Sequence, residues 1–557
     1  MKKIAPLACL LLTVSCTQAP PGDPLKPAFE AISPDSLLKS IQTLASDEFE
    51  GRKPGSAGED KTVAFLERNF KQMGLKPGNP DGTYVQKVPL AGTNSKLQQG
   101  SFSVNGKALA AEANKDFVAV STRFAEDTAV KDSDIVFVGY GVVAPEYGWD
   151  DYKGVDVKGK TIVMLVNDPQ IPDPSDPSKL DPNMFRGRAM TYYGRWTYKY
   201  EIASEKGAAA AIIVHETALA GYGFEVVVSG KAGEMFNIQR SNNNMARVPV
   251  EGWMTFDKTA ELFRAAGLDL AAMKKEALKK EFKPVPLKGA KANFHVTNTL
   301  RKIDSRNMVA KLEGSDPALK DEYLVYTAHW DHFGRNTDLQ GDQIMHGAID
   351  NASGTAGLLE LARGYTKLSP APKRSVLFLA VTGEEQGLLG AEYYASNPLY
   401  PLKKTVANIN MDGLNAWGKT KDLVIVGLGN SSLDDTVTDV LKSRQRVPVG
   451  DAEPEKGFYY RSDHFQFAKV GVPALDPEAG IDFIGKPEGF GRQKRDEYTE
   501  KIYHKPADKP DPAWDLSGAV EDLRVLLETG YRVLQDPKLP EWKPGNEFKA
   551  RRDAMMK

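Results

Sequence analysis

The feature that most constrains the fold is a regular alternation of apolar, strand-like runs and helical stretches from residue 307 onward. The strand-like runs occupy residues 322–328, 375–381, 406–411 and 423–426. The helical stretches occupy residues 352–368, 387–395 and 515–534. Apolar strands that alternate with helices are typical of a sheet that is buried on both faces. We therefore expect this part of the chain to adopt an α/β fold in which helices cover both faces of one sheet.

Length and charge exclude several classes of protein. A chain of 557 residues is too long for one compact core, and its 41% hydrophobic and 26% charged residues are ordinary for a globular protein. Lysine plus arginine (72) nearly balances aspartate plus glutamate (74), so we expect no nucleic-acid partner, which would normally require a basic surplus. Beyond the N-terminus, no apolar run approaches the roughly 20 residues of a membrane span. An enzyme or a receptor-like binding module remains.

The first residues are typical of an export signal. Lys2 and Lys3 precede an apolar stretch, residues 4–14, that is too short to span a bilayer. We therefore expect a signal peptide over residues 1–15 and localisation in the exported bacterial cell envelope.

Cys16 is the expected point of attachment to a membrane. The residues before it, Leu-Thr-Val-Ser, resemble a bacterial lipobox, which predicts a lipoprotein whose membrane contact is a lipid on Cys16. Thr13 is an unusual residue in such a motif, so ordinary cleavage near Ala19, giving a periplasmic or secreted protein, is the alternative. The polar, proline-rich residues 16–30 are expected to form a tether. Because Cys9 leaves with the signal peptide, we expect no internal disulfide.

Histidine and acidic residues gather at the ends of the predicted strands. The chain has seven histidines, and five of them lie between residues 329 and 504. In open α/β sheets, catalytic groups collect at the carboxyl ends of the strands. Five segments fit that position: AHWDHFG (328–334), GAIDNASG (347–354), TGEEQG (382–387), NINMDG (408–413) and YHKPAD (503–508).

Each of these segments alone has an ordinary structural explanation. Asp350 can be a helix cap, and Glu384 with Glu385 can be a solvated acidic turn. Considered together, two histidines and three carboxylates, one of them bridging, can complete a pair of zinc sites that share a water molecule. A histidine ligand commonly has its second nitrogen held by a carboxylate, and Asp331 is a candidate for that role.

The five segments match, in order, those of the M28 zinc peptidases, and residues 295–535 resemble this family of co-catalytic aminopeptidases and related carboxypeptidases. The resemblance implies the zinc exopeptidase fold, a mixed sheet sandwiched by helices, and two Zn²⁺ ions as cofactors. It also implies a ligand set for the two ions. The bridging ligand would be Asp350, one site would be completed by His329 and Asp412, and the other by Glu385 and His504.

The same resemblance assigns roles to residues around the ligands. Glu384 is expected to be the general base, which takes a proton from the bridging water and passes it to the leaving amine. Tyr459 matches a tyrosine that polarises the scissile carbonyl in some members of the family. Asp331 and Asp508 are expected to be acids that support the ligands. The remaining histidines of this region are expected to be structural: His332, His346 and His464.

The rest of the chain divides around this region. We expect residues 31–119 to be the N-terminal part of the peptidase domain and residues 289–540 to be its M28-like catalytic part. Between them, residues 120–288 contain the pieces GVDVKGK and EKGAAAAII, which resemble a protease-associated (PA) domain, a β-rich insert of several peptidase families. An unrelated β-rich insert is the alternative. The charged residues 541–557 are expected to be a peripheral C-terminal tail.

The family resemblance predicts a metallopeptidase that acts on peptide substrates, with removal of amino-terminal residues as the favoured activity. A carboxypeptidase or dipeptidase on the same scaffold is the alternative, and it requires a cationic site such as Arg461 for the substrate carboxylate. A receptor-like module without catalysis and a one-metal glutaminyl cyclase make less use of a complete ligand set. A cluster of arginine and aromatic residues between 186 and 198 is either a solvated surface or a rim of the active site that binds peptide.

Overall fold

The computed structural model describes residues 23–557. The predicted signal peptide (1–15), Cys16 and the first part of the predicted tether lie outside the described residues. The end of the tether differs from the prediction, because Lys26–Ala31 form helix α1 with Ala28 buried against the protein core. Within residues 23–557, no helix combines the length and the hydrophobicity that crossing a bilayer requires.

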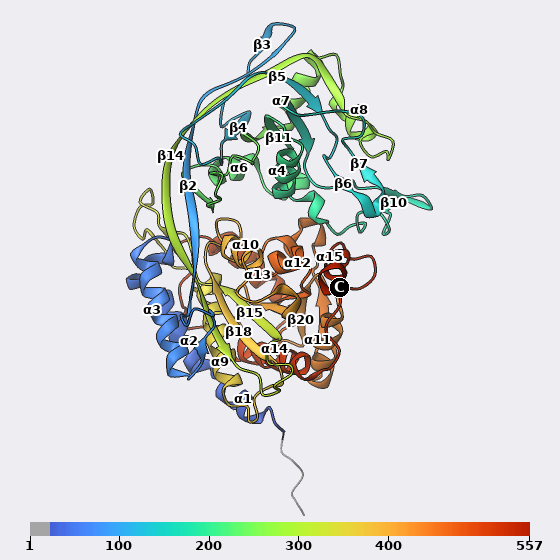
Figure 1. Ribbon diagram of the computed structural model, residues 1–557. Helices are drawn as coiled ribbons and strands as arrows, with labels where there is room; N and C mark the ends of the chain where they lie inside the picture. Colours follow the sequence, from blue (N-terminus) through green and yellow to red (C-terminus); the bar gives the residue numbers. More distant parts are fainter. Residues whose placement is uncertain (1–22) are drawn as a thin grey trace, which may run out of the picture.

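One mixed sheet of 16 strands runs through the two lobes of the molecule (Figure 1). The first lobe comprises residues 23–84 and 313–557, and the second lobe comprises residues 105–284. The first-lobe strands are β15 (Tyr323–His329), β18 (Ser375–Val381), β19 (Thr405–Asn410), β20 (Asp422–Val426), β21 (Val447–Gly450) and β22 (Ala474–Glu478). β15 is parallel to β18 and to β19, so the carboxyl ends of these three strands lie at one edge.

Helices cover both faces of the first-lobe sheet. Along β18, Val376 and Phe378 point into one core, whereas Leu377 and Leu379 point into the other, as expected for the alternation of side chains along a strand. One core is closed by α1, α2 (Pro34–Leu44), α3 (Ala57–Gln72), α9 (Gly354–Tyr365), α11 (Ser432–Ser443) and α14 (Ser517–Gln535). The other is closed by α10 (Leu389–Ser396) and α12 (His464–Lys469). The predicted α/β fold, a mixed sheet sandwiched by helices, is confirmed.

The second lobe is rich in strands. Its central strands are β4 (Phe117–Val120), β5 (Asp127–Phe137), β8 (Thr161–Leu165), β11 (Ala210–His215) and β13 (Val250–Thr255), with α4 (Trp196–Glu205) and α7 (Phe256–Ala265) beside them. β8 pairs in parallel with β5 and with β11. Of the two pieces that resemble a PA domain, GVDVKGK (154–160) directly precedes β8, and EKGAAAAII (205–213) ends inside β11. The identity of this lobe as a PA domain stays a prediction.

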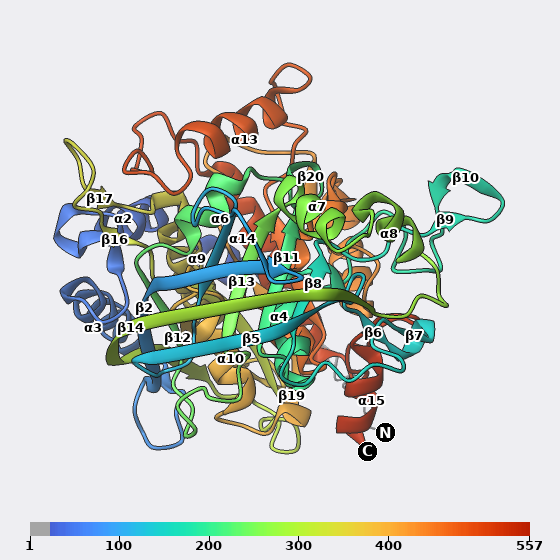
Figure 2. The same ribbon diagram turned by 90° about the horizontal axis from the view of Figure 1, so that it is seen from above.

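Two long strands join the lobes. β2 (Val85–Val104) and β14 (Val285–Leu312) pair antiparallel from Val104 opposite Ala290 to Val85 opposite Met308, and they are visible as a continuous ribbon in Figures 1 and 2. One end of β14 pairs with β5 of the second lobe, and its other end pairs with β18 of the first lobe. The domain boundary expected at residue 289 therefore falls inside a continuous strand.

The C-terminal segment is packed rather than peripheral. Trp542 and Phe548 are buried in the core that also contains α12, and α15 (Lys549–Met556) follows them. The carboxylate of Glu547 accepts a hydrogen bond from the hydroxyl of Tyr460 at 2.6 Å. The expectation of a peripheral tail over 541–557 is wrong. Although the segment is rich in charged residues, burial of the rings of Trp542 and Phe548 holds it against the core.

Phe378 tests the core between β15, β18 and α9. Its ring centroid lies 6.1 Å from that of Tyr326 and 6.0 Å from that of Tyr365, and its side chain is fully buried. Phe378→Ala should lower the free energy of unfolding by about 3–5 kcal/mol, the usual cost of removing a buried aromatic ring. Denaturant unfolding followed by circular dichroism measures the loss. The control is Val447→Ala at an exposed position, and equal stability of the two variants would contradict this core.

Candidate metal centre

The edge formed by the carboxyl ends of β15, β18 and β19 carries four of the expected site residues. His329 is the last residue of β15. Glu384 and Glu385 follow β18 after a short turn, and Asp412 lies two residues beyond β19. Because the three strands are parallel neighbours, these side chains meet at one place although they lie far apart in the sequence.

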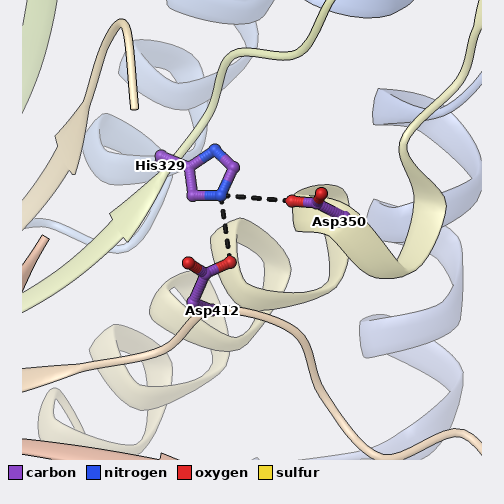
Figure 3. A group of neighbouring side chains, drawn as sticks. All are labelled: His329, Asp350 and Asp412. Atoms are coloured by element: carbon purple, nitrogen blue, oxygen red, sulfur yellow. Dashed lines mark hydrogen bonds and ion pairs between the residues drawn. The ribbon is translucent and has the colours of Figure 1, made fainter. Parts of the chain in front are cut away.

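Asp350 lies between two histidines. Its Oδ1 is 3.3 Å from Nε2 of His329, and its Oδ2 is 3.1 Å from Nε2 of His504. His329 Nε2 also lies 3.0 Å from Oδ1 of Asp412, as Figure 3 shows, and His504 Nε2 lies 3.2 Å from Oε2 of Glu385. The structure thus brings the five expected ligands together in two groups that share Asp350.

The electrostatics of the five residues follow from their mutual contacts. Burial alone would raise the pKa of Asp350, but its contacts with His329 and His504 bring it well below the usual value. Burial would likewise lower the pKa of His504, yet the carboxylates of Glu385 and Asp350 raise it to about 10. The carboxylates therefore need positive charge beside them to remain ionised in this buried place.

The donor set fits a divalent metal ion. Among the described residues, three groups place their ligand atoms within 4.8 Å of one another: His329 with Asp350 and Asp412, His329 with Glu384 and Glu385, and His332 with Asp350 and Glu385. Imidazole nitrogen and carboxylate oxygen are the ligands that zinc takes in sites with an open coordination position.

His332 lies in the centre, although the sequence predicted a local structural role for it. Its Nδ1 is 2.5 Å from Oε1 of Glu385, the carboxylate whose other oxygen faces His504. Its Nε2 is buried and has no hydrogen-bond partner within residues 23–557. The signal that could have found it is its place in AHWDHFG, in the same loop as His329.

Glu384 stands beside the ligands and is held by Asp331. Its Oε2 lies 3.9 Å from Nε2 of His329, and its backbone N–H donates to Oδ1 of Asp331 at 3.1 Å. Burial raises the pKa of Glu384 well above the usual value, and the charges of Asp412 and Glu385 raise it further. This carboxyl group can therefore accept and retain a proton.

Asp331 and Asp508 support the ligands in ways that differ in detail from expectation. Nδ1 of His329 lies 3.2 Å from the backbone carbonyl of Asp331 and 3.8 Å from its carboxylate. Asp508 accepts the backbone N–H groups of Ile349 and Asp350, each at 3.0 Å, so it fixes the backbone of the shared ligand. Burial raises the pKa of Asp331 to about 7 and that of Asp508 to about 6.

The segment that contains Tyr459 contributes a different residue from the one expected. Ser462 donates its hydroxyl to Oδ2 of Asp412 at 2.6 Å, a contact that the sequence did not suggest. The hydroxyl of Tyr459 is buried without a hydrogen-bond partner among the described residues, and its ring lies edge-to-face with His464, 4.7 Å between centroids. Tyr459 thus forms no hydrogen bond to the five ligands in residues 23–557, and neither does His464. His346 bonds locally, to Ala45 and Asp342.

Arg52 is the main residue that sequence reasoning missed. It is fully buried, and its guanidinium donates to the backbone carbonyls of Trp330 (2.9 Å), Leu44 (2.7 Å), His346 (2.7 Å) and Gly347 (2.8 Å). The carbonyls of Trp330, His346 and Gly347 belong to the loops that follow His329 and precede Asp350, whereas Leu44 ends α2. Burial lowers the pKa of Arg52 to about 10, so it stays charged at neutral pH. Arg52 therefore fixes two ligand-bearing loops to each other.

Comparison with known proteins agrees with this centre. Residues 307–527 match Peptidase family M28, so this segment is a domain of that family. A "Probable zinc metalloprotease" of Pyrenophora tritici-repentis (strain Pt-1C-BFP) is 36% identical over 138 residues, 25% of this chain and 27% of that protein. The "Aminopeptidase NAALADL1" of Mus musculus is 33% identical over 130 residues, 22% of this chain and 16% of that protein. The chain therefore spans about a quarter or less of these curated relatives.

The fold extends the likeness beyond the matched segment. The solved structure of the aminopeptidase from Aneurinibacillus sp. strain AM-1 superimposes with a TM-score of 0.50 at 18% sequence identity, covering 92% of this chain and 97% of that chain. This likeness concerns the fold. The class of metallopeptidase rests on the match of residues 307–527 to Peptidase family M28 alone, and that class implies zinc as the metal.

Arg52→Met tests whether this arginine holds the ligand loops. The substitution keeps most of the side-chain volume but leaves four buried carbonyl groups without their donor, so it should lower the free energy of unfolding by about 3–5 kcal/mol. It should also weaken zinc binding, measured by competition with a chelator. The matched control, Arg68→Met on the exposed side of α3, should change neither quantity. Equal behaviour of the two variants would contradict the role of Arg52.

Proposed function

We propose that this protein is a two-zinc exopeptidase that removes amino-terminal residues from peptides. The observation that carries the proposal is the carboxylate of Asp350, each of whose oxygens faces a different histidine. Asp412 joins His329 in one ligand group, and Glu385 joins His504 in the other. Such a pair of groups with a shared carboxylate fits two zinc ions.

The residues around the ligands supply the proton transfers. When bound, the two ions supply the Lewis acidity that lowers the pKa of water and polarises a peptide carbonyl. Glu384 takes the proton of the attacking water, and burial beside Asp412 and Glu385 favours its protonated form. It then gives the proton to the leaving amine. Asp331, which accepts the backbone N–H of Glu384, positions this carboxyl group.

The preference for amino termini rests on likeness. The mouse relative that matches over 130 residues is named an aminopeptidase. The second candidate is a carboxypeptidase or dipeptidase on the same scaffold, which Arg461 favours as a cationic group close to the centre. An N-acetylated dipeptide with a free carboxylate separates the candidates, because an enzyme that requires a free amine leaves it intact and a carboxypeptidase cleaves it.

Glu384→Gln should keep the metal and lose turnover. The amide preserves the shape of the side chain but cannot accept the proton, so kcat on leucyl substrates should fall by about 10²–10⁴-fold. Zinc content, measured by elemental analysis, should be unchanged. The control is Glu488→Gln on the exposed loop before α13 (Phe490–Lys501), which should leave kcat unchanged. Full activity of Glu384→Gln would contradict the assignment of Glu384 as the general base.

Metal content tests the two-ion proposal. We expect the purified chain to hold about two zinc ions and His504→Ala to hold about one, because His504 contacts only one of the two ligand groups. His332→Ala should keep about two ions with an affinity about 10–100-fold weaker, the usual effect of removing a partner of a ligand. His295→Ala, on the part of β14 that pairs with β5, is the control. A chain without zinc would favour a receptor-like module, and His504→Ala with two ions would contradict the ligand set.

A further inference from the structure

A row of buried polar side chains lies behind Asp412 on one face of the first-lobe sheet. Thr327 of β15 is the partner of Asn410 of β19 in the parallel pairing, and Asn408 precedes Asn410 by two residues, on the same face. Thr327, Asn408 and Asn410 are 0% exposed. Ser462, in the loop before α12, is buried beside them. Buried polar groups are costly unless they are hydrogen-bonded, so the partners of this polar row show what it does.

Hydrogen bonds join the polar row and lead to Asp412. Nδ2 of Asn408 donates to Oγ1 of Thr327 at 3.1 Å, and the hydroxyl of Thr327 donates to Oδ1 of Asn410 at 2.7 Å. Nδ2 of Asn410 donates to Oγ of Ser462 at 2.7 Å. The hydroxyl of Ser462 donates to Oδ2 of Asp412 at 2.6 Å. The polar row therefore ends on a carboxylate of the candidate metal centre.

The direction of these hydrogen bonds is fixed at Asn408. Its Nδ2 also donates to the backbone carbonyl of Val325 at 3.2 Å, and a carbonyl oxygen can only accept. The hydroxyl of Thr327 consequently receives a proton from Asn408, so its own proton is directed at Asn410. This contact identifies the amide oxygen of Asn410 as the acceptor and its NH₂ group as the donor to Ser462.

Asp476 uses the second proton of the same NH₂ group. It lies on β22, the strand that pairs with the other side of β19, and its Oδ1 accepts from Nδ2 of Asn410 at 3.1 Å. The amide of Asn410 thus has a partner for its oxygen and for both of its protons. Because the oxygen of Ser462 accepts one of those protons, the hydroxyl proton of Ser462 is directed at Asp412.

The backbone around Asp412 is held separately from its carboxylate. The side chain of Asn351 donates to the carbonyl of Met411 and accepts the N–H of Gly413, each at 3.0 Å. The freedom that remains at Asp412 is rotation of its own side chain, which the bond from Ser462 to Oδ2 restricts. Its other oxygen, Oδ1, is the one that faces the histidine of its ligand group. One oxygen is thus held by the protein, and the other is presented to the centre.

We propose that Asn410 is a positioning residue that acts on the metal centre through Ser462, because it orients the serine hydroxyl so that Asp412 offers Oδ1 to the metal. This inference rests on the proposed two-zinc function and extends it to a residue without a hydrogen bond to any of the five ligands in residues 23–557. Hydrogen bonds that follow one another in one direction strengthen each other inside a protein. The effect of Asn410 on Asp412 therefore requires the hydroxyl of Ser462.

A double-mutant cycle tests this route. The zinc affinity of the full chain is measured by competition with a chromophoric chelator, in the unaltered protein and in the variants. Ser462→Ala should weaken zinc binding about tenfold, the usual effect of removing a partner of a ligand. Asn410→Leu keeps a similar volume without the amide. It should weaken binding by a similar factor when Ser462 is present, and by less than about twofold in the Ser462→Ala background.

A second variant covers the case in which Asn410→Leu does not fold. Thr327→Val keeps the shape of the side chain and removes only the hydroxyl that bonds the amide of Asn410. It should weaken zinc binding about two- to threefold in the unaltered protein and leave it unchanged in Ser462→Ala. The matched control is Thr529→Val on α14, where an equally buried hydroxyl bonds the carbonyl of Val525 at 2.8 Å. This control should change zinc affinity in neither background.

Unfolding of the metal-free chain distinguishes a purely structural effect. Asn410→Leu should lower the free energy of unfolding with and without the hydroxyl of Ser462, because Thr327 and Asp476 lose a buried partner in both cases. Its effect on zinc affinity should instead depend on that hydroxyl. Equal losses of zinc affinity in the two backgrounds would overturn the inference, because Asn410 would then act through the fold. Unchanged zinc affinity in Asn410→Leu and Thr327→Val would overturn it as well.

The outcomes also separate this inference from the proposed function. A chain that binds two zinc ions and hydrolyses peptides, but in which Asn410 and Ser462 act independently on zinc affinity, would refute the inference and leave the function standing. Dependence of Asn410 on Ser462 in a chain that binds zinc without hydrolysing peptides would refute the peptidase and leave the positioning role standing. A chain that binds no zinc would refute both.

Discussion

The structure of the candidate metal centre depends on how the protein stabilises several carboxylates that lie close together. Asp350, Glu385 and Asp412 meet at one sheet edge, with Glu384 beside them, and all four are largely buried. Carboxylates at such distances repel one another unless cations stand between them. His329, His504 and the guanidinium of Arg52 supply part of the positive charge. Bound zinc would supply the rest, which would link metal binding to the stability of this edge.

Backbone anchoring gives the centre its shape. Arg52 reaches the carbonyls of Trp330 and Gly347, and Asp508 holds the N–H groups of Ile349 and Asp350. The loop that carries Asp350 is thereby fixed in two ways. Its backbone N–H groups donate to the carboxylate of Asp508, and its backbone carbonyl at Gly347 accepts from the guanidinium of Arg52. Ligand positions set in this way lose little freedom when an ion binds, which is the advantage of preorganisation.

The sequence predicts the centre better than it predicts the connections around it. The strand at 375–381 and the acids that follow β18 and β19 were predictable, because strand periodicity and the position of acids at strand ends are local signals. The assignment of these residues as ligands came from the resemblance to the M28 family. Arg52 was not predictable, since three of its four partners lie more than 270 residues away along the chain. His332 was assigned a structural role, although its place in the same loop as His329 was a local signal for a role in the centre.

Two larger features were not predicted from the sequence either, because they also depend on contacts between distant segments. The 20-residue strand β2 has no continuous apolar run that would predict it, because much of it pairs with β14 while one side is exposed to solvent. The segment 541–557 reads as a charged tail, because its two buried aromatic residues are few among many charges. In both cases the segment is held by contacts with a distant part of the chain, and the local composition of a segment does not predict such contacts.

The ribbon of β2 and β14 has a mechanical consequence. Two hydrogen-bonded strands without an intervening loop resist stretching but bend easily along their length, so the second lobe is held at a fixed contour distance while its tilt can vary. The hydrogen bond of Arg186 to Asn430 and the ion pair of Arg188 with Glu455 also cross from the second lobe to the first. The second lobe can therefore tilt on the ribbon only if these contacts break.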